Sequence, residues 1–279
     1  MIAVRSLSFR YAGAEEPTLR DISADIPDGE FLGIIGPAGA GKTTFINCLS
    51  GIIPHAVRGD FYGSVTVDGL DTVDSRLTDI SRLVGTVFQD VESQIISSVV
   101  EDEMLYGLEN FGGPREEVEE RLTFALEKVG IANLRHRTIA SLSGGQRQKV
   151  AIASVVALRP KILILDEPTG ELDPGSSRQV FSLLRDLNRE FGLTVVVIEQ
   201  KIMLLCEFAR RLAVLSEGKI VRDGTVREVL GDIGALEDIG VNCPRAARFS
   251  SLLAEKTGRE IPVCVNADEA EEAARRLIG

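Results

Sequence analysis

A glycine-rich run at residues 36–44 fits the phosphate-binding pattern G-x-x-x-x-G-K-[ST]. Glycines let backbone N–H groups turn toward a phosphate, and the N-terminus of the following helix adds partial positive charge. Lys42 would reach the β- and γ-phosphates of a nucleotide, and the Thr43 hydroxyl would ligate Mg²⁺. A glycine-rich turn without a ligand is the alternative. The candidate nucleotide-binding residues are Gly36, Pro37, Ala38, Gly39, Ala40, Gly41, Lys42, Thr43 and Thr44.

Two carboxylates, Asp166 and Glu167, follow the apolar run at residues 162–165. Ligands of α/β proteins bind at the carboxyl ends of parallel strands, so Asp166 is the natural partner of Thr43 at a magnesium ion. Successive side chains on a strand diverge, which leaves Glu167 free to polarise an attacking water molecule. The alternative is that both are solvated charges at a strand end.

A second candidate anion site is the run Ser143-Gly144-Gly145-Gln146, which precedes a helical pattern at residues 147–158. A serine cap followed by glycines exposes the N–H groups of a helix N-terminus. Taken alone, this run is better explained as a simple helix cap. Two phosphate-binding helix ends in one chain nevertheless require an explanation.

The elements around these motifs predict an α/β fold with a mainly parallel sheet covered on both faces. Residues 2–26 predict two antiparallel strands joined by a loop, and residues 97–158 are mostly helical. The other predicted strands lie at 31–35, 65–69, 83–88, 162–165 and 194–198, with a hairpin at 212–221. The other predicted helices lie at 42–49, 177–190, 203–208, 245–255 and 268–277.

Composition narrows the function classes. The 279 residues include 31 Lys+Arg and 42 Asp+Glu, a net charge of −11 that disfavours coating of nucleic acid. The longest apolar stretches are far short of the roughly 20 residues that span a bilayer. No signal peptide is visible, so we expect a cytosolic protein. The scattered cysteines, Cys48, Cys206, Cys243 and Cys264, suggest reduced core thiols rather than a zinc site or a disulfide framework.

The motifs occur in the order and approximate spacing of the ATPase subunits of ABC transporters, which the sequence resembles over residues 2–231. Gln89, after the predicted strand at 83–88, and the run Gly170-Glu-Leu-Asp173 complete the set. The resemblance implies a P-loop NTPase core with an N-terminal antiparallel β-subdomain, a helical subdomain and a short α-helical C-terminal extension. It also implies ATP hydrolysis, with ATP and Mg²⁺ as cofactors.

In that family two subunits close head to tail, and each ATP is held between one P-loop and the partner's signature. The resemblance therefore assigns Ser143, Gly144, Gly145 and Gln146 to the nucleotide of the partner subunit. Tyr11 would stack on adenine, although an aromatic residue of the core is the alternative. Gln89 would contact Mg²⁺, beside Thr43 and Asp166, or the attacking water. Asp173 would link the two sites across the dimer.

The sequence departs from the family pattern at Gln200. After the strand at 194–198 the family usually has a histidine that contacts the γ-phosphate, whereas this chain reads Glu199-Gln200-Lys201. A glutamine can donate and accept hydrogen bonds but cannot become cationic. With Glu167 and Gln89 as the other catalytic candidates, we expect slower hydrolysis at this site.

Segments at 51–72, 87–90 and 100–117 are similar to energy-coupling factor (ECF) importers, which take up vitamins or, in some members, cobalt or nickel. Such importers contain a second ATPase subunit, a transmembrane coupling subunit and a membrane subunit that binds the substrate. One alternative is the ATPase of an importer fed by a soluble binding protein. Another is a soluble ABC protein acting on DNA or ribosomes, which the acidic balance disfavours; no nucleic-acid partner is expected.

The resemblance divides the chain into an ATPase domain at 1–231, with a helical subdomain at about 97–158, and a C-terminal extension at 232–279. The extension either assists dimer contact or covers exposed core. The second ATPase could be an identical or a different chain. As a transporter ATPase, the protein is expected at the cytoplasmic face of the cell membrane, as a peripheral subunit.

Overall fold

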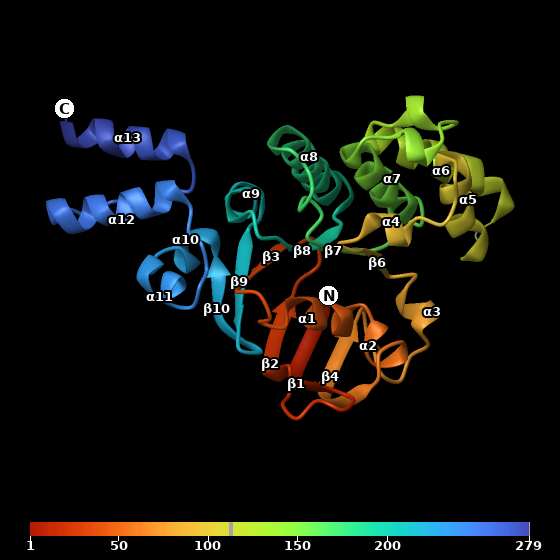
Figure 1. Ribbon diagram of the computed structural model, residues 1–279, viewed down its shortest axis with the longest axis horizontal. Coiled ribbons are helices and arrows are strands. Elements are labelled where there is room, and N and C mark those ends of the chain that lie inside the picture. Colours follow the sequence, from red (N-terminus) through yellow and green to blue (C-terminus); the bar gives the residue numbers. More distant parts are fainter. Residues whose placement is uncertain (112–113, 279) are drawn as a thin grey trace.

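The computed structural model describes residues 1–111 and 114–278, which form the predicted α/β fold (Figure 1). The strands are β1 (Ile2–Tyr11), β2 (Leu19–Ile26), β3 (Phe31–Ile35), β4 (Gly59–Val67), β5 (Leu70–Asp71), β6 (Val84–Val87), β7 (Ile162–Asp166), β8 (Thr194–Ile198), β9 (Arg211–Ser216) and β10 (Lys219–Thr225). The first helices are α1 (Lys42–Leu49), α2 (Ile52–His55), α3 (Leu77–Ile80), α4 (Val91–Gln94), α5 (Val100–Asn110), α6 (Arg115–Val129) and α7 (Gly144–Val156). The later helices are α8 (Pro174–Phe191), α9 (Ile202–Phe208), α10 (Val226–Val229), α11 (Ile233–Asp238), α12 (Arg245–Thr257) and α13 (Ala267–Ile278).

The larger sheet has the order β10-β9-β3-β8-β7-β6 and is parallel except for the β9–β10 hairpin. Every residue of β3, β7 and β8 is buried. Continuous apolar runs of this kind are typical of parallel strands covered on both faces, and they confirm the strands predicted at 31–35, 162–165 and 194–198. The carboxyl ends of β3, β7 and β8 therefore meet at one edge.

The smaller sheet is antiparallel, in the order β2-β1-β4-β5. It confirms the two strands predicted in residues 2–26, but β4 begins at Gly59 rather than near residue 65. Its first half pairs with the end of β1, where a Cβ at Gly59 would lie 2.2 Å from the Arg10 carbonyl oxygen. Glycines break the alternation of apolar side chains there, so the sequence pattern does not reveal that half of the strand.

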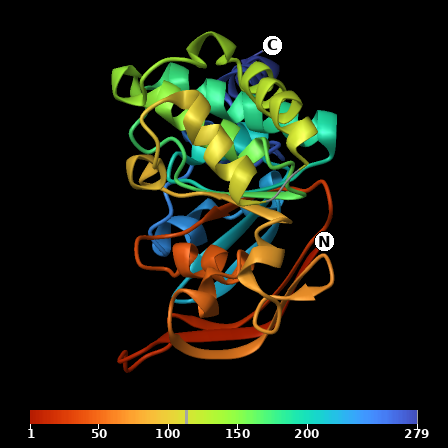
Figure 2. The same cartoon turned by 90° about the vertical axis from the view of Figure 1, so that its right-hand side faces the viewer.

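Two apolar cores lie on opposite faces of the larger sheet. Figure 2 shows helices on one side of this sheet and α1 with the antiparallel sheet on the other. Alternate residues of β3 belong to different cores: Phe31 and Ile35 face one, and Leu32 and Ile34 face the other. The second core is shared with α1 and the antiparallel sheet, and the first with α5–α9 and the extension. The central strands are thus fixed from both sides.

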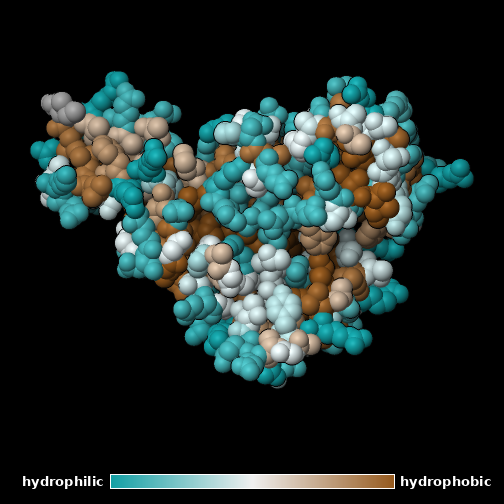
Figure 3. All heavy atoms as spheres, viewed as in Figure 1, coloured by the Kyte–Doolittle hydropathy of each residue, from teal (hydrophilic) through white to brown (hydrophobic). Residues whose placement is uncertain are grey.

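Helices α5, α6 and α7 confirm the mostly helical segment predicted at 97–158. At the other end of the molecule, α12 and α13 form a projecting hairpin and confirm the two helices predicted there (Figure 1). Figure 3 shows apolar side chains exposed on this hairpin, and Phe249 and Leu252 are 39% and 48% exposed. The short helices α10 and α11 were not predicted, because fewer than two turns give little periodicity.

All four cysteines are free thiols: Cys48, Cys206 and Cys264 are buried, and Cys243 is half-buried. This agrees with the prediction of reduced core thiols. Within residues 1–111 and 114–278, none of the helices combines the length and apolar character that crossing a membrane requires.

Candidate functional site

The predicted phosphate loop joins the buried strand β3 to α1, and its shape depends on glycine. At Gly36 a Cβ would lie 2.0 Å from the carbonyl oxygen of Leu215, and Gly41, which precedes α1, has a φ of 96°. No L-residue with a side chain fits the first position without moving the backbone of β9. The Lys42 ammonium donates hydrogen bonds to the carbonyl oxygens of Gly36 and Pro37, both at 2.9 Å. The lysine therefore lies over the loop.

The hydroxyl of Thr43 meets the carboxylate of Asp166. Thr43 Oγ1 donates to Asp166 Oδ2 at 2.8 Å, although the two residues lie far apart in the sequence. Asp166 ends β7, which pairs with β8, and β8 pairs with β3. The sheet thus brings together the two residues that the sequence predicted as magnesium ligands. A hydroxyl and a carboxylate at one point are the hard oxygen donors that Mg²⁺ prefers, so the residues present fit this ion.

Burial shapes the electrostatics of this pair. Asp166 is only 4% exposed. Its burial raises the carboxyl pKa, as does the Glu167 carboxylate, while the hydrogen bond from Thr43 and the charge of Lys42 act in the opposite direction. The pKa of Lys42 is lowered, since burial outweighs the attraction of Glu167 and Asp166. A buried carboxylate next to a lysine ammonium is a place where a cation and a polyphosphate can be held together.

Glu167 points to a different set of partners. Its φ of 47° turns the chain out of β7, and its N–H donates to the Ile198 carbonyl oxygen at 2.9 Å. The Gln200 amide donates to both carboxylate oxygens of Glu167, at 2.8 and 2.9 Å. The Gln89 amide donates to one of them at 3.3 Å. The three catalytic candidates thus meet at the ends of β6, β7 and β8, with Glu167 as acceptor.

Two residues missed by the sequence reasoning flank Gln200. Glu199 is 2% exposed; its carboxylate accepts from the Thr169 hydroxyl and from the N–H groups of Gln200 and Lys201. The Lys201 ammonium donates to the carbonyl oxygens of Thr169 and Leu172 and to the Ser177 hydroxyl. The only sequence signal was their position after β8. Together they hold the segment that follows Glu167.

The run Ser143–Gln146 forms the N-terminus of α7 as a capping box. Ser143 Oγ accepts from the Gln146 N–H at 3.3 Å, and Gln146 Oε1 accepts from the Ser143 N–H at 3.0 Å. Gly144 lines a cleft of about 890 Å³ together with Gln89, Glu167 and Gln200. This run can be both a helix cap and an anion site, because the capped helix end is exposed.

Asp173 caps the neighbouring helix α8. Its carboxylate accepts from the N–H groups of Gly175 and Ser176 at 2.9 and 3.0 Å. The hydrogen bond from the Ser176 hydroxyl, with these two, lowers its pKa. A Cβ at Gly145 would lie 3.1 Å from Ser176 Oγ. The caps of α7 and α8 therefore lie side by side, and both are exposed to a possible partner.

Tyr11 lies at the end of β1, beside the helix that follows the phosphate loop. Its hydroxyl is 2.8 Å from the hydroxyl of Thr44, and its ring packs edge-on against Phe9 with centroids 5.0 Å apart. Tyr11 is half-buried. These contacts hold Tyr11 in place but leave open both readings of its role.

The chain matches known proteins over most of its length. The sequence model of the ABC transporter family matches residues 19–170. A protein of Pyrococcus abyssi named as an ABC transporter ATP-binding protein is 41% identical over 249 residues, covering 89% of each chain. A Pyrococcus horikoshii protein with the same description is 40% identical over 275 residues, covering 99% of this chain and 96% of its own.

Two solved structures share the fold. CbiO1 of Clostridium perfringens, described as part of the ABC transporter complex CbiONQ, has a TM-score of 0.76 and 30% identity, covering 88% of this chain and 96% of its own. The ATP-binding cassette MJ0796, solved as a dimer with ADP and Pi, has a TM-score of 0.70 and 28% identity, covering 81% and 99%. With its phosphate loop and paired carboxylates, the chain belongs to the ABC transporter family, as an ATP-binding subunit with ATPase activity.

Proposed function

We propose that this chain hydrolyses ATP to drive an ECF-type importer that takes up a small micronutrient, either a vitamin or a transition-metal ion. The observation that carries the ATPase part is the Glu167 carboxylate, held by two amides one residue beyond the Thr43–Asp166 pair. A fixed acceptor beside a phosphate and magnesium site is the arrangement that nucleotide hydrolysis requires.

Each residue has a distinct task in the proposed mechanism. The backbone N–H groups of residues 36–44 and the Lys42 ammonium bind the phosphates, and Lys42 leaves its two carbonyl partners to do so. Thr43, Asp166 and Gln89 would hold Mg²⁺, which when bound neutralises charge on the phosphates. Glu167 accepts the hydrogen bond of the attacking water and orients it.

The second half of each site comes from another chain. We propose that two ATPase subunits, identical or different, close head to tail, so that Ser143–Gln146 of one chain contacts the γ-phosphate held by its partner. Asp173, adjacent to that turn, links the two sites, and Tyr11 stacks on the adenine. The dimeric structure of the related MJ0796 cassette, with ADP and Pi, supports this arrangement.

The membrane partner is proposed to bind the segment from Gln89 to Asn110. Two large apolar side chains of this segment are exposed, Ile96 by 66% and Tyr106 by 47%, and so is Phe88, directly before it, by 39%. Gln89 contacts Glu167, so movement of this segment would reach the catalytic carboxylate directly. CbiO1 belongs to a transporter complex, which supports a coupling subunit and a substrate-binding membrane subunit as partners at the cytoplasmic face.

A conventional importer fed by a soluble binding protein would use the same ATPase chemistry. The two readings differ in the membrane subunits that co-purify with this chain: a coupling subunit with a membrane substrate binder, or paired permeases. The soluble ABC protein acting on DNA or ribosomes is the third reading, and the net charge of −11 disfavours it.

The first test is steady-state phosphate release by the purified chain with Mg-ATP, using Glu167→Gln as the blank. We expect turnover above the blank, because the chain carries both halves of a head-to-tail site. If the purified wild-type chain binds ATP but shows no turnover, hydrolysis requires a complex with a second ATPase or with the membrane subunits. Equal turnover of wild type and the Glu167→Gln blank, at a clearly measurable rate, would contradict the role of Glu167.

A further inference from the structure

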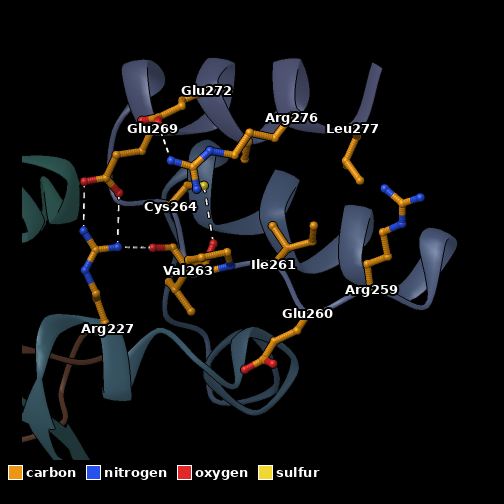
Figure 4. A pocket seen from close by; sticks show the side chains of 12 residues that line it. Arg227, Arg259, Glu260, Ile261, Val263, Cys264, Glu269, Glu272, Arg276 and Leu277 are labelled. Carbon is orange, nitrogen blue, oxygen red and sulfur yellow. Dashed lines mark hydrogen bonds and ion pairs between the residues drawn. The ribbon is translucent and has the colours of Figure 1, made fainter. Parts of the chain in front are cut away.

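The C-terminal extension and α10 border an open cavity of about 530 Å³, which lies between α10, α13 and the loop before α13 (Figure 4). Three arginines and three glutamates line it, so their charges balance; Arg227 pairs with Glu269 at 2.8 Å, and Arg276 pairs with Glu272. The cavity thus offers little net charge for an ionic ligand. A smaller cavity, where the extension meets the phosphate loop, has a different character.

The extension reaches the phosphate loop through a fixed turn after α11. The Gly240 N–H donates to the Glu237 carbonyl oxygen and the Val241 N–H to that of Leu236, both at 2.9 Å. With Gly240 at a φ of 80°, these two hydrogen bonds form a Schellman motif. Val241 and Leu236 are both buried in the core, 6% and 1% exposed. The residue that follows, Asn242, is therefore held on a rigid support.

This turn lies directly against the phosphate loop. A Cβ placed at Gly240 would be 3.7 Å from the Cβ of Pro37. A cavity of about 140 Å³ opens between the two segments, lined by Pro37, Ala38 and Lys42 on one side, by Gln200 on another, and by Asn242. Its volume suits one phosphate group and a few water molecules, whose share of liquid volume is about 30 Å³ each.

We propose that the extension forms a third wall of the nucleotide site, and that the Asn242 side chain donates a hydrogen bond to the terminal phosphate of ATP. The cavity is shared by Lys42, proposed to bind the phosphates, and by Gln200, at the position where the family usually has a histidine that contacts the γ-phosphate. This inference rests on the proposed function, because it presupposes that the loop binds ATP. It goes further by assigning nucleotide recognition to a residue outside 1–231.

The hydrogen-bond donors around the cavity, rather than its net charge, favour a phosphate, since Glu199 balances the charge of Lys42. Lys42 supplies a cation, and Gln200 and Asn242 supply neutral amides that can donate. Glu199 also lines the cavity, but its carboxylate already accepts from the Thr169 hydroxyl and from two backbone N–H groups. A terminal phosphate would therefore meet donors on three sides. ADP lacks the γ-phosphate, so under this proposal it offers Asn242 no group to contact.

The test compares equilibrium binding of Mg-ADP with that of a Mg-bound ATP analogue whose β,γ-bridge is a non-hydrolysable imido group. Replacing Asn242→Ala removes the donor, and we expect about three- to tenfold weaker binding of the triphosphate with less than twofold change for ADP. Asn242→Asp adds a negative charge and should weaken triphosphate binding further. Asn133→Ala, at an exposed position in the helical subdomain, is the matched control and should change neither.

Lys42→Ala separates this inference from the proposed function. If Lys42→Ala binds both nucleotides with wild-type affinity, the assignment of the nucleotide site to the phosphate loop is wrong. If Lys42→Ala abolishes binding while the Asn242 variants keep the triphosphate-to-ADP affinity ratio within twofold of wild type, only the role of Asn242 is overturned. If the Asn242 variants weaken the binding of both nucleotides equally, that role is also overturned. The turn would then support the loop without contacting the terminal phosphate.

Discussion

Gln200 and Glu167 form the contact that most distinguishes this site. Both carboxylate oxygens of Glu167 accept from one neutral amide, at 2.8 and 2.9 Å. A histidine at this position could carry a positive charge toward the γ-phosphate, whereas glutamine offers only a dipole. Transition-state charge on the phosphate is thus stabilised less by glutamine than it would be by a cation.

For Gln200→His we predict faster steady-state phosphate release, by about three- to tenfold, because the imidazolium adds charge stabilisation. Turnover is measured across pH 6 to 8.5, and the gain should shrink at high pH as the imidazole loses its proton. Gln200→Ala serves as the control for simple loss of the Glu167 contact. A histidine variant that is no faster than wild type would count against the slower hydrolysis expected of glutamine.

The buried carboxylate of Asp166 lowers the stability of the folded chain. Burial raises its pKa, so the folded chain binds a proton on Asp166 more tightly than the unfolded chain does. The ionised group therefore lowers the free energy of unfolding, and this cost develops as the pH rises from the ordinary aspartate range through the raised pKa. The cost is complete above the raised pKa, and at a pH well below about 3.9 it vanishes.

We accordingly predict that Asp166→Asn raises the unfolding midpoint at pH 7, by about 2–4 °C, while abolishing ATP hydrolysis. An amide can still accept from Thr43, so the hydrogen bond is kept. Thermal unfolding in the presence of a chelator measures the effect, and repeating it at about pH 3.5 should show a smaller difference. A variant less stable than wild type at pH 7 would contradict the cost of the buried carboxylate.

At the scale of elements, the segment after β8 holds the segment after β7. Glu199 and Lys201, on either side of Gln200, together contact Thr169, Leu172 and Ser177. Asp173, proposed to face the partner subunit, follows this segment immediately. A shift of Gln200 from Glu167 toward a phosphate would therefore pull on the residues that lead to the dimer surface.

We predict that Lys201→Met lowers kcat by about tenfold, equivalent to about 1.4 kcal/mol, with little change in KM for ATP. The methionine keeps the aliphatic stem but cannot donate to the two carbonyl oxygens. Lys201→Arg retains a cation and should recover part of the rate. If Lys201→Met instead raised KM and left kcat unchanged, the contact would act on nucleotide binding rather than on catalysis.

The sequence predicts some elements better than others for identifiable reasons. Strands β3, β7 and β8 are continuous apolar runs, so their position and burial could be read directly. The first half of β4 could not, because its glycines leave no alternation, and its pairing with β1 spans about fifty residues. Register between distant strands depends on packing that no local pattern records.

The same distinction applies to the site. The Thr43–Asp166 pair was predicted because each residue follows a recognisable strand and strand ends converge in a parallel sheet. The hydrogen bonds of Glu199 and Lys201 were not predicted, because their partners lie in a loop about thirty residues away in the sequence. Nothing in the residue types themselves indicates those partners. The meeting of the Gly240 turn with Pro37 was likewise invisible in the sequence.

At the scale of the whole molecule, the exposed apolar side chains between Phe88 and Tyr106 predict where the membrane subunits bind. We expect Ile96→Asp to reduce co-purification of the membrane subunits at least tenfold, because a carboxylate would be buried at the interface. ATP binding by the isolated chain should be unchanged. The control is Tyr62→Asp, because Tyr62 is 63% exposed, close to the 66% of Ile96, but lies in β4. Unchanged assembly with Ile96→Asp would exclude this placement.

The four native thiols have a practical consequence for work on subunit motion. Burial raises the pKa of Cys206 to about 12 and that of Cys243 to about 11, and it also raises the pKa values of Cys48 and Cys264. Maleimides react with the thiolate, and at pH 7 a thiol of pKa 11 is ionised in about one molecule in ten thousand. A cysteine introduced on the exposed surface could therefore carry a fluorophore selectively. Distances between two labelled chains could then be followed through a hydrolysis cycle without first removing the native cysteines.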